Sequence, residues 1–368
     1  IPQETLFRQT SGGVTYRIPA LLYIPPSGTF LAFSEKRSSL RDEEAEYLVL
    51  RRGHRHGSTV QWDPVEELPA LALPGRRTMN PCPLYDATTA TVFLFCICVE
   101  RGETERCQIW SGCSAARLCY STSADGGHRW SPLRDVTDEA IGPDLTHWAT
   151  FAVGPGHGIQ LASGRLVVPA YAYYVHARLC GLVPLRCCTR QHALVFYSDD
   201  GGRSWRKGAM LAGVPTGECQ VAEIRPNPSH KPLLYCNARA AARGCRVVAF
   251  SSDLGSHFQC PAPCSALGET PQGCQGSVVS FAAPEGAGGE PTWLLYSHPT
   301  NRWKRSDLGI YLNPSPTDRE GWWHPWVLNP GPSGYSDLAV CPGGFFGCLF
   351  ERGATGTCEE ITFCLFTL

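Results

Sequence analysis

Short runs of apolar residues alternate along the whole chain with turns rich in Gly, Pro and Asp. Residues 28–33, 165–171 and 292–296 are such runs, enriched in the Val, Leu, Phe, Tyr and Thr side chains that favour β-strands. No long stretch places apolar residues at i, i+3, i+4 and i+7, which is the pattern of an amphipathic helix. The 38 Gly and 30 Pro residues supply the turns. The pattern therefore predicts an all-β fold with many short strands.

A second pattern recurs within the turns. Residues 123–130 and 198–205 both read S-x-D-x-G-x-x-W, and residues 251–258 repeat the motif with Phe in place of Trp. We expect the Asp side chain to accept a hydrogen bond from the backbone two residues on, and Gly to adopt a positive φ. The aromatic ring is then expected to pack under the hairpin.

The spacing of the aromatic residues predicts how many such units the chain holds. Trp62, Trp130, Trp205, Phe258 and Trp323 are separated by 68, 75, 53 and 65 residues. Propeller blades repeat at about 40–50 residues, so these intervals suit four-stranded blades with longer loops. Five marked units and one unmarked unit predict a six-bladed β-propeller that forms a single domain over residues 1–368. Propellers close by pairing strands from both ends of the chain, here residues 6–8 and 360–368.

Composition and charge exclude several classes of function. The formal net charge of −1 over 368 residues argues against a nucleic-acid-binding protein. No apolar run approaches the roughly 18–20 residues that span a bilayer. None of the Asn residues lies in an N-x-S/T glycosylation site with x other than Pro, which argues against a secreted protein.

The 19 Cys residues are an odd number, and most of them lie singly in strand-like segments with no C-x-x-C pair. This distribution favours reduced and mostly buried thiols over the disulfide framework of a short secreted protein. Cys260 and Cys264 have no second pair at zinc-finger spacing, so we expect no metal.

Several motifs together resemble the sialidase (neuraminidase) superfamily. Residues 16–19, Tyr-Arg-Ile-Pro, match its [YF]-R-[IVL]-P motif, and the S-x-D-x-G turns match its Asp boxes. Segments 77–83, 148–157, 168–173, 273–278 and 334–338 are similar to the vertebrate cytosolic and plasma-membrane-associated sialidases. The similarity runs from about Leu6 to Leu368. It implies a six-bladed propeller with Asp-box turns that needs no metal and no organic cofactor.

The resemblance implies a site for the carboxylate of sialic acid. Guanidinium groups bind carboxylates through charge-assisted, often bidentate hydrogen bonds. By motif, the family's three carboxylate-binding arginines correspond to Arg17, Arg239 and Arg305. Such a cluster of like charges needs an acidic group behind it. Glu35 corresponds to the family's acidic partner of the first arginine.

The resemblance also implies catalytic groups. Sialidases use a tyrosine nucleophile where other glycosidases use a carboxylate. Tyr335 matches this nucleophile and Glu218 its base, with Glu223 as the competing choice of base. Asp42, in the acidic loop of residues 37–46, matches the acid/base that protonates the leaving oxygen and then activates water. The implied reaction is hydrolysis with retention, through a sialosyl-tyrosine intermediate.

Further contacts to the substrate follow from the same resemblance. Met79 and Asn80 correspond to contacts near the N-acetyl group and the 4-hydroxyl group. The remaining expected contacts, several of them to the glycerol tail and the rim of the site, are Arg37, Tyr171, Tyr173, Gln272 and Glu105.

The stretch of residues 174–188 is apolar and rich in Cys. The plasma-membrane-associated members of the family carry a similarly apolar insert at this place. We hypothesise that residues 174–188 contact a bilayer or a lipid substrate, with Cys187 and Cys188 as candidate acylation sites. The alternative is a loop that packs on its own propeller.

The sequence thus predicts a retaining exo-α-sialidase that acts on gangliosides and other sialylated glycolipids and glycoproteins. We expect a peripheral protein of the plasma membrane, or else a cytoplasmic one. One alternative is a non-catalytic Asp-box propeller that binds sialic acid or a protein, which would lack part of the set Asp42, Glu218 and Tyr335. The other is a transferase of the same fold, which would need an aromatic platform for the acceptor sugar.

Overall fold

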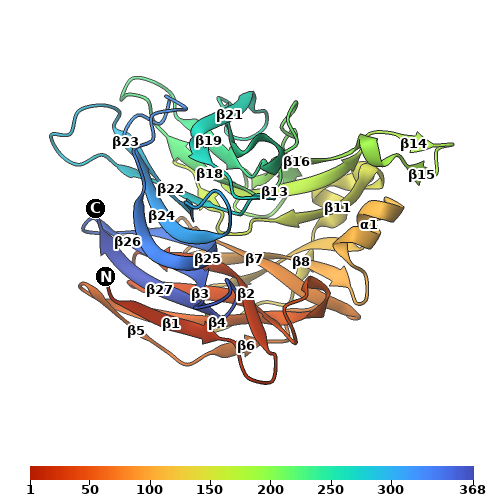
Figure 1. The fold of residues 1–368 in the computed structure, drawn as a ribbon, viewed down its shortest axis with the longest axis horizontal. Coiled ribbons are helices and arrows are strands. Elements are labelled where there is room, and N and C mark those ends of the chain that lie inside the picture. Colours follow the sequence, from red (N-terminus) through yellow and green to blue (C-terminus); the bar gives the residue numbers. More distant parts are fainter.

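The computed structural model describes residues 1–368, apart from the side chain of Ala241. Its strands form several antiparallel sheets, with a small hairpin protruding at one side (Figure 1). One sheet contains β2 (Thr15–Ile24), β3 (Thr29–Arg37), β4 (Ala45–His56), β5 (Thr59–Trp62) and β6 (Glu66–Leu68). The next contains β7 (Arg76–Asp86), β8 (Thr91–Glu100), β9 (Ala116–Ser123) and β10 (Arg134–Asp135).

Two more sheets and the hairpin form the middle of the chain. One sheet contains β11 (Trp148–Val153), β12 (Ile159–Gln160), β13 (Leu166–Val175), β16 (Thr189–Ser198) and β17 (Arg206–Lys207). The hairpin between its strands β13 and β16 consists of β14 (Arg178–Leu179) and β15 (Val183–Pro184). The other sheet contains β18 (Cys219–Ile224), β19 (Leu233–Ala238), β20 (Cys245–Ser251) and β21 (Gln259–Gly268).

The last sheet has seven strands and joins the two ends of the chain. Its strands, beside β1 (Gln3–Arg8), are β22 (Ser277–Ala282), β23 (Thr292–Pro299), β24 (Ser306–Asn313), β25 (Trp326–Cys341), β26 (Phe345–Arg352) and β27 (Glu360–Thr367). Strand β1 pairs with β27, so the expected pairing of strands from both ends is confirmed. Accordingly, the two termini lie close together in Figure 1.

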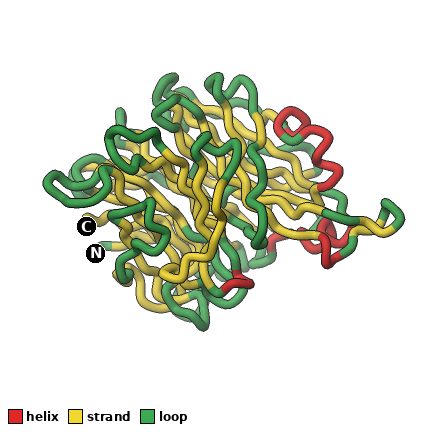
Figure 2. The backbone as a smooth tube through the Cα atoms, turned by 90° about the horizontal axis from the view of Figure 1, so that it is seen from above, coloured by secondary structure: helices red, strands yellow, loops and turns green.

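Helical segments are few and short (Figure 2). The α-helices are α1 (Glu105–Ser111) and α2 (Thr137–Ala140). The 3-10 turns are η1 (Asp42–Glu44), η2 (Gly142–His147), η3 (Arg186–Cys188) and η4 (Ala241–Arg243). No helix in the described part of the chain is long and apolar enough to cross a membrane.

The hydrophobic core consists of separate layers between neighbouring sheets. Strand β8 has eight consecutive buried residues because other sheets cover both of its faces. Phe93 and Phe95 of β8 contact Trp205 on the next sheet. Contacts between strands β2, β7, β11, β13, β18, β22 and β25 link neighbouring sheets around a ring. The fold is therefore all-β, as predicted, with a propeller-like arrangement of sheets.

The three repeated turns share one hydrogen-bond pattern. In the first, Ser123 Oγ accepts a hydrogen bond from the Gly127 backbone N–H at 2.8 Å, and Asp125 Oδ1 accepts one from the Arg129 N–H at 2.9 Å. The Asp125 side chain thus reaches the N–H groups three and four residues on, rather than the expected two, because the N–H two residues on, that of Gly127, is bonded to Ser123. The expected positive φ is confirmed at Gly127, where it is 88°. The expected packing of the aromatic ring is confirmed for Trp205, which is 1% exposed.

Candidate active site

A cavity of about 610 Å³ brings together nearly all of the residues that the sequence singles out. Glu35 does not line it, because this side chain is fully buried behind the wall. The predicted residues that line the cavity are Arg17, Arg37, Asp42, Met79, Asn80, Glu105, Tyr171, Tyr173, Glu218, Arg239, Gln272, Arg305 and Tyr335.

The three predicted arginines converge on one tyrosine from three different strands or their ends. Arg17 lies in β2, Arg239 follows β19, and Arg305 precedes β24. The Arg17 and Arg305 guanidinium carbons lie 4.9 Å and 5.4 Å from the centre of the Tyr335 ring. Arg239 Nη1 lies 3.3 Å from Tyr335 Oη. Three cationic groups around one cavity form a strong site for an anion.

The acidic partner of Arg17 is Glu351, and the expectation that Glu35 has this role is wrong. Arg17 donates from Nε and Nη2 to the two carboxylate oxygens of Glu351, at 2.7 Å and 3.1 Å. The Glu351 carboxylate also accepts the backbone N–H groups of Ile18 and Tyr335. Burial opposes the ionised form of Glu351, but Arg17 and these hydrogen bonds outweigh it, so the pKa of Glu351 is lowered.

Glu35 instead orients a different arginine. The Glu35 carboxylate accepts two hydrogen bonds from Arg37, at 2.9 Å and 2.7 Å, and one from the Asn80 backbone N–H at 2.7 Å. Arg37 Nη1 in turn donates to Asp42 Oδ1 at 2.6 Å. Arg17 and Glu35 are cross-strand partners on β2 and β3, but a bulge in β2 after Arg17 locally breaks the regular pairing. Sequence motifs alone do not reveal this exchange of partners.

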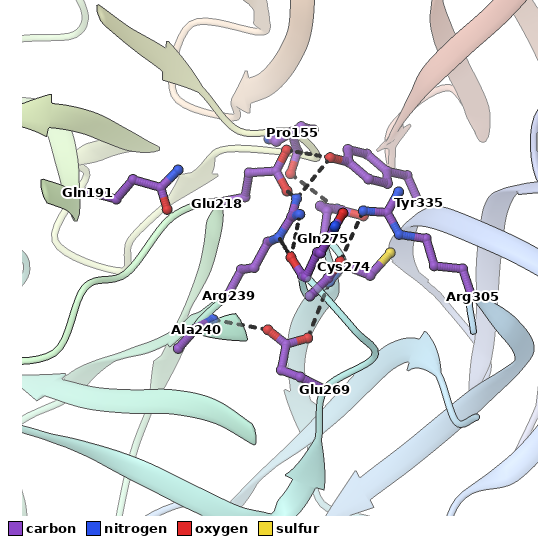
Figure 3. Close-up of polar contacts among 12 residues, drawn as sticks. Pro155, Gln191, Glu218, Arg239, Ala240, Glu269, Cys274, Gln275, Arg305 and Tyr335 are labelled. Atoms are coloured by element: carbon purple, nitrogen blue, oxygen red, sulfur yellow. Dashed lines mark hydrogen bonds and ion pairs between the residues drawn. The ribbon is translucent and has the colours of Figure 1, made fainter. Parts of the chain in front are cut away.

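The Tyr335 hydroxyl donates a hydrogen bond of 2.7 Å to Glu218 Oε1, and Arg239 Nη1 donates to the other Glu218 oxygen at 2.9 Å (Figure 3). Burial raises the pKa of Tyr335 well above its usual range, and the negative charge of Glu218 raises it further. The three arginines oppose this shift without overcoming it. The phenol is therefore neutral at rest and has an adjacent proton acceptor.

Glu223, the competing choice of base, lies outside the cavity. Its carboxylate accepts hydrogen bonds from the backbone N–H of Ala162 at 3.2 Å and 3.3 Å. Glu218 is thus the candidate of the two that touches Tyr335.

The segment of residues 269–275 holds two of the arginines (Figure 3). The Gln272 carbonyl accepts hydrogen bonds from Arg239 Nε and Nη2, at 3.2 Å and 2.7 Å. The Gly273 carbonyl accepts one from Arg305 Nη2 at 2.9 Å. Gln272 has a φ of 63°, a conformation that costs energy in a residue with a side chain and often marks a functional site. Ile18 and Asn80, also in the cavity wall, have φ values of 65° and 55°.

Another part of the cavity wall is formed by tyrosines and a glutamate. Tyr173 Oη donates to Glu105 Oε1 at 3.2 Å and accepts a hydrogen bond from Gln191 Nε2. The pKa of Glu105 is raised, first because its carboxylate lies among the cavity walls and then because Asp42 and Glu218 carry charge of the same sign. This wall has the polar and aromatic character that suits a hydroxylated ligand.

Sequence reasoning missed Glu351, Gln191 and Arg77 as parts of the site. Gln191 and Arg77 line the cavity, and Glu351 supports it from behind. One signal pointed to Glu351: it is a lone carboxylate after an apolar strand segment, and a buried charge is rare unless it is paired. Among the described residues, no group of three or more His, Cys, Asp or Glu side chains could hold a metal ion.

Comparison with known proteins shows the family of the chain. Residues 28–348 match the family model of the BNR repeat-like domain. The chain is 53% identical to Sialidase-3 of Homo sapiens, covering 98% of this chain and 91% of that protein. It is 44% identical to Sialidase-2 of Mus musculus, covering 100% of this chain and 96% of that protein.

A solved structure described as the Hadza microbial sialidase Hz136 has the same fold, with a TM-score of 0.79 at 23% sequence identity. The match covers 100% of this chain and 68% of that one. Because curated relatives well above 30% identity match over nearly the full length, the expected resemblance to vertebrate sialidases is confirmed. The chain belongs to the sialidase family of glycoside hydrolases.

Proposed function

We propose that the protein is a retaining exo-α-sialidase that releases terminal sialic acid from gangliosides and other sialylated glycolipids and glycoproteins. The observation that carries the proposal is the 2.7 Å hydrogen bond from Tyr335 Oη to Glu218, surrounded by Arg17, Arg239 and Arg305. A neutral nucleophile next to a cluster of cations suits a substrate that carries a carboxylate on its reacting carbon, because a carboxylate nucleophile would be repelled.

The arginines bind and orient the sialic acid. Its carboxylate accepts hydrogen bonds from the three guanidinium groups, which fixes the anomeric carbon above the Tyr335 hydroxyl. Glu351 keeps Arg17 in place through two hydrogen bonds and limits the repulsion between the three cations. The other contacts proposed for the sugar come from the cavity wall: Arg37, Met79, Asn80, Tyr171, Tyr173, Gln272 and Glu105. Glu35 acts indirectly, by orienting Arg37.

Catalysis proceeds in two displacements at the anomeric carbon. In the first, Tyr335 Oη bonds to this carbon and passes its proton to Glu218, while Asp42 donates a proton to the departing glycosidic oxygen. In the second, Asp42 takes a proton from water and the water oxygen bonds to the anomeric carbon, while the bond from this carbon to Tyr335 Oη breaks and Glu218 returns the proton to the tyrosine oxygen. Two inversions leave the product with the configuration of the substrate.

The test is sialic acid release from ganglioside micelles and from sialyllactose, measured for the wild-type protein and for the variants Tyr335→Phe and Asp42→Ala. We expect both variants to lose most of the activity, and proton NMR of the wild-type reaction to show the α-anomer of sialic acid first. Initial β-anomer would contradict retention. If folded wild-type protein released nothing from either substrate, the non-catalytic sialic-acid-binding or protein-binding propeller would replace the enzyme.

We also propose that residues 1–368 form one six-bladed propeller. The first half of β25 pairs with β24, and its second half pairs with β26. An apolar layer lies between the two parts of this sheet, with Leu295 and Ile310 on one side and Leu338 and Phe346 on the other. The seven-stranded sheet therefore reads as two blades that share one long strand, which gives six units with the four other large sheets.

The β14–β15 hairpin supports peripheral contact of residues 174–188 with a membrane. Arg178 anchors its base by donating a hydrogen bond to the Gly112 carbonyl at 2.9 Å. The tip carries apolar side chains without a covering layer, of which Leu182 is 77% exposed and Leu179 and Val183 are each 59% exposed. Exposed apolar side chains on a protruding hairpin suit insertion into a lipid surface. From this contact we infer a peripheral location at the plasma membrane, with a cytoplasmic pool as the alternative.

Vesicle flotation tests this contact. Ser in place of Leu179, Leu182 and Val183 is expected to reduce the fraction of protein that floats with lipid vesicles, while hydrolysis of sialyllactose stays unchanged. Equal flotation of this triple variant and the wild type would instead support a loop that packs only on its own propeller.

A further inference from the structure

A second hollow adjoins the cavity that holds the proposed catalytic groups. It has a volume of about 500 Å³ and shares Asp42, Glu105 and Tyr173 with that cavity. Its outer part is formed by α1 and by the start of η3, which carry Trp110 and Arg186. We refer to this hollow as the Trp110 groove. The two spaces meet at the proposed acid/base.

The position of Asp42 indicates what the Trp110 groove receives. In the proposed reaction Asp42 protonates the oxygen that links sialic acid to the rest of the substrate. The group that departs with this oxygen must therefore lie beside Asp42, on the side away from the sialic acid. The Asp42 side chain is 64% exposed, so it is open to such a group. The Trp110 groove is the space next to Asp42 that the sialic acid cavity leaves free.

The side chains of the Trp110 groove suit a sugar ring. Trp110 is 61% exposed, although an apolar ring of this size gains free energy when it is covered. The Arg186 guanidinium carbon lies 4.3 Å from the centre of an indole ring of Trp110. An aromatic face packs against the C–H groups of a sugar, and a neighbouring guanidinium donates hydrogen bonds to its hydroxyl groups.

The charges that line the Trp110 groove favour a neutral sugar over an acidic one. Arg106 and Arg186 in the Trp110 groove are offset by Asp42, Glu43 and Glu105. The groove thus lacks the excess of cations that characterises the carboxylate-binding cavity, and a second sialic acid would meet these three acidic groups.

We propose that the Trp110 groove binds the neutral hexose to which the sialic acid is attached, with Trp110 as its stacking platform. This inference rests on the proposed sialidase function and extends it from the released sugar to the remainder of the substrate. Trp110 determines specificity for this sugar, whether it departs, as in the hydrolase, or enters as the acceptor, as in the transferase alternative, and it takes no part in the chemical step.

The test compares two substrates that share sialic acid and differ in the aglycone. Sialyllactose carries the hexose next to the scissile bond, and the methyl α-glycoside of sialic acid carries only a methyl group. We expect Trp110→Ala to lower kcat/KM for sialyllactose by about tenfold and to change that for the methyl glycoside by less than about twofold. Trp110→Phe keeps an aromatic face and is expected to restore most of the loss.

Two controls keep the outcomes separate. Trp323 is exposed to a similar extent and lies outside the groove, so Trp323→Ala should leave both substrates unaffected. Lactose should inhibit methyl glycoside hydrolysis by the wild type, and inhibition of Trp110→Ala should need several-fold more lactose. Equal loss on both substrates, or loss on neither, would overturn the groove proposal while the sialidase function stood. Failure of the wild type to cleave either substrate would overturn both.

Discussion

Single buried charges decide the geometry of this site. Glu351 is fully buried and binds one arginine and two backbone N–H groups, one of which belongs to the proposed nucleophile Tyr335. The Glu351 carboxylate thereby links the cluster of three arginines, through Arg17, to the backbone of the nucleophile. The motif around Arg17 matches the family, but it cannot name a partner that lies 334 residues away on another strand. Only the topology brings the two together.

Loss of the Glu351 charge should therefore weaken both substrate binding and the fold. Glu351→Gln leaves Arg17 without its buried counter-charge, so we expect a loss of stability on the order of 3–5 kcal/mol. We also expect a raised KM for sialyllactose. Urea unfolding and steady-state kinetics measure the two effects. Glu100→Gln is the matched control, since the exposed pair of Glu100 with Arg76 should contribute at most about 1 kcal/mol.

Two glutamates of one segment separate the proposed base from its sequence competitor. Glu218 touches Tyr335, whereas Glu223 binds the Ala162 backbone outside the cavity. Glu218→Gln should lower kcat by about 10²–10⁴-fold, because the tyrosine loses its proton acceptor. Glu223→Gln should stay near the wild-type rate. Rates of sialyllactose hydrolysis measure the difference, with circular dichroism as a check of folding. A larger loss of kcat in Glu223→Gln than in Glu218→Gln would make Glu223 the base.

At the scale of elements, the segment of residues 269–275 connects the two arginines that it binds, Arg239 and Arg305, to the sheets behind them. Glu269 accepts hydrogen bonds from the backbone N–H groups of Ala240 and Cys274 and from His298. Ala240 follows Arg239 in the chain, and Cys274 follows the carbonyl group that binds Arg305. Glu269 is thus a positioning residue for two arginines, although it does not line the cavity.

The pH dependence of stability should carry the signature of Glu269. Burial alone would raise its pKa, but Arg246 and His298 outweigh burial and lower the pKa of Glu269 to about 2. The unfolded chain therefore takes up a proton first, and the wild type loses this stabilisation as the pH falls from about 4.5 towards 2. Glu269→Gln should be less stable at pH 6, by a margin that narrows by up to about 1.4 kcal/mol per pH unit below pH 4.5.

Urea unfolding at pH 6, 4 and 3 measures this margin, with Glu100→Gln as the control. A margin that stayed constant with pH would show that Glu269 acts through packing alone. The same variant should raise KM for sialyllactose, because two arginines lose their support.

Some elements of this protein could be predicted from the sequence and others could not, for physical reasons. Turn motifs are local, so the S-x-D-x-G turns and the strands that flank them could be predicted directly. The pairing of Arg37 with Glu35, two residues apart on β3, was not predicted, because the motif assigned Glu35 to Arg17, whose actual partner Glu351 lies on a distant strand. The continuous strand β25 was not predicted either, because no local signal marks the point where its pairing partner changes from β24 to β26.

At the scale of the whole molecule, closure depends on β1. This strand pairs only with β27, and its residues Leu6 and Phe7 are buried in the layer between the terminal strands and the first sheet. The pairing of β1 with β27 could be predicted from the sequence, because propellers pair their outermost strands. The position of the tip of the β14–β15 hairpin could not be predicted, because no such rule constrains it.

Deletion of residues 1–8 should destabilise the whole protein. The deletion removes Leu6 and Phe7 from the core, each of which contributes about 1.5–3 kcal/mol, and exposes the edge of β27. We expect a lower Tm and aggregation in size-exclusion chromatography. Phe7→Ala keeps the strand and should lower the Tm less, without aggregation. An unchanged Tm after the deletion would show that β27 needs no partner.

The pairing of Arg17 with Glu351 has a consequence for synthesis of the protein. Arg17 is synthesised 334 residues before its counter-charge Glu351, which lies next to the proposed nucleophile in space. Strand β1 likewise waits for β27. A nascent chain can build its middle sheets in order, yet it holds an uncompensated arginine and an open sheet edge until β26 and β27 have been synthesised. We therefore expect sialidase activity to begin only after β26 and β27 have left the ribosome.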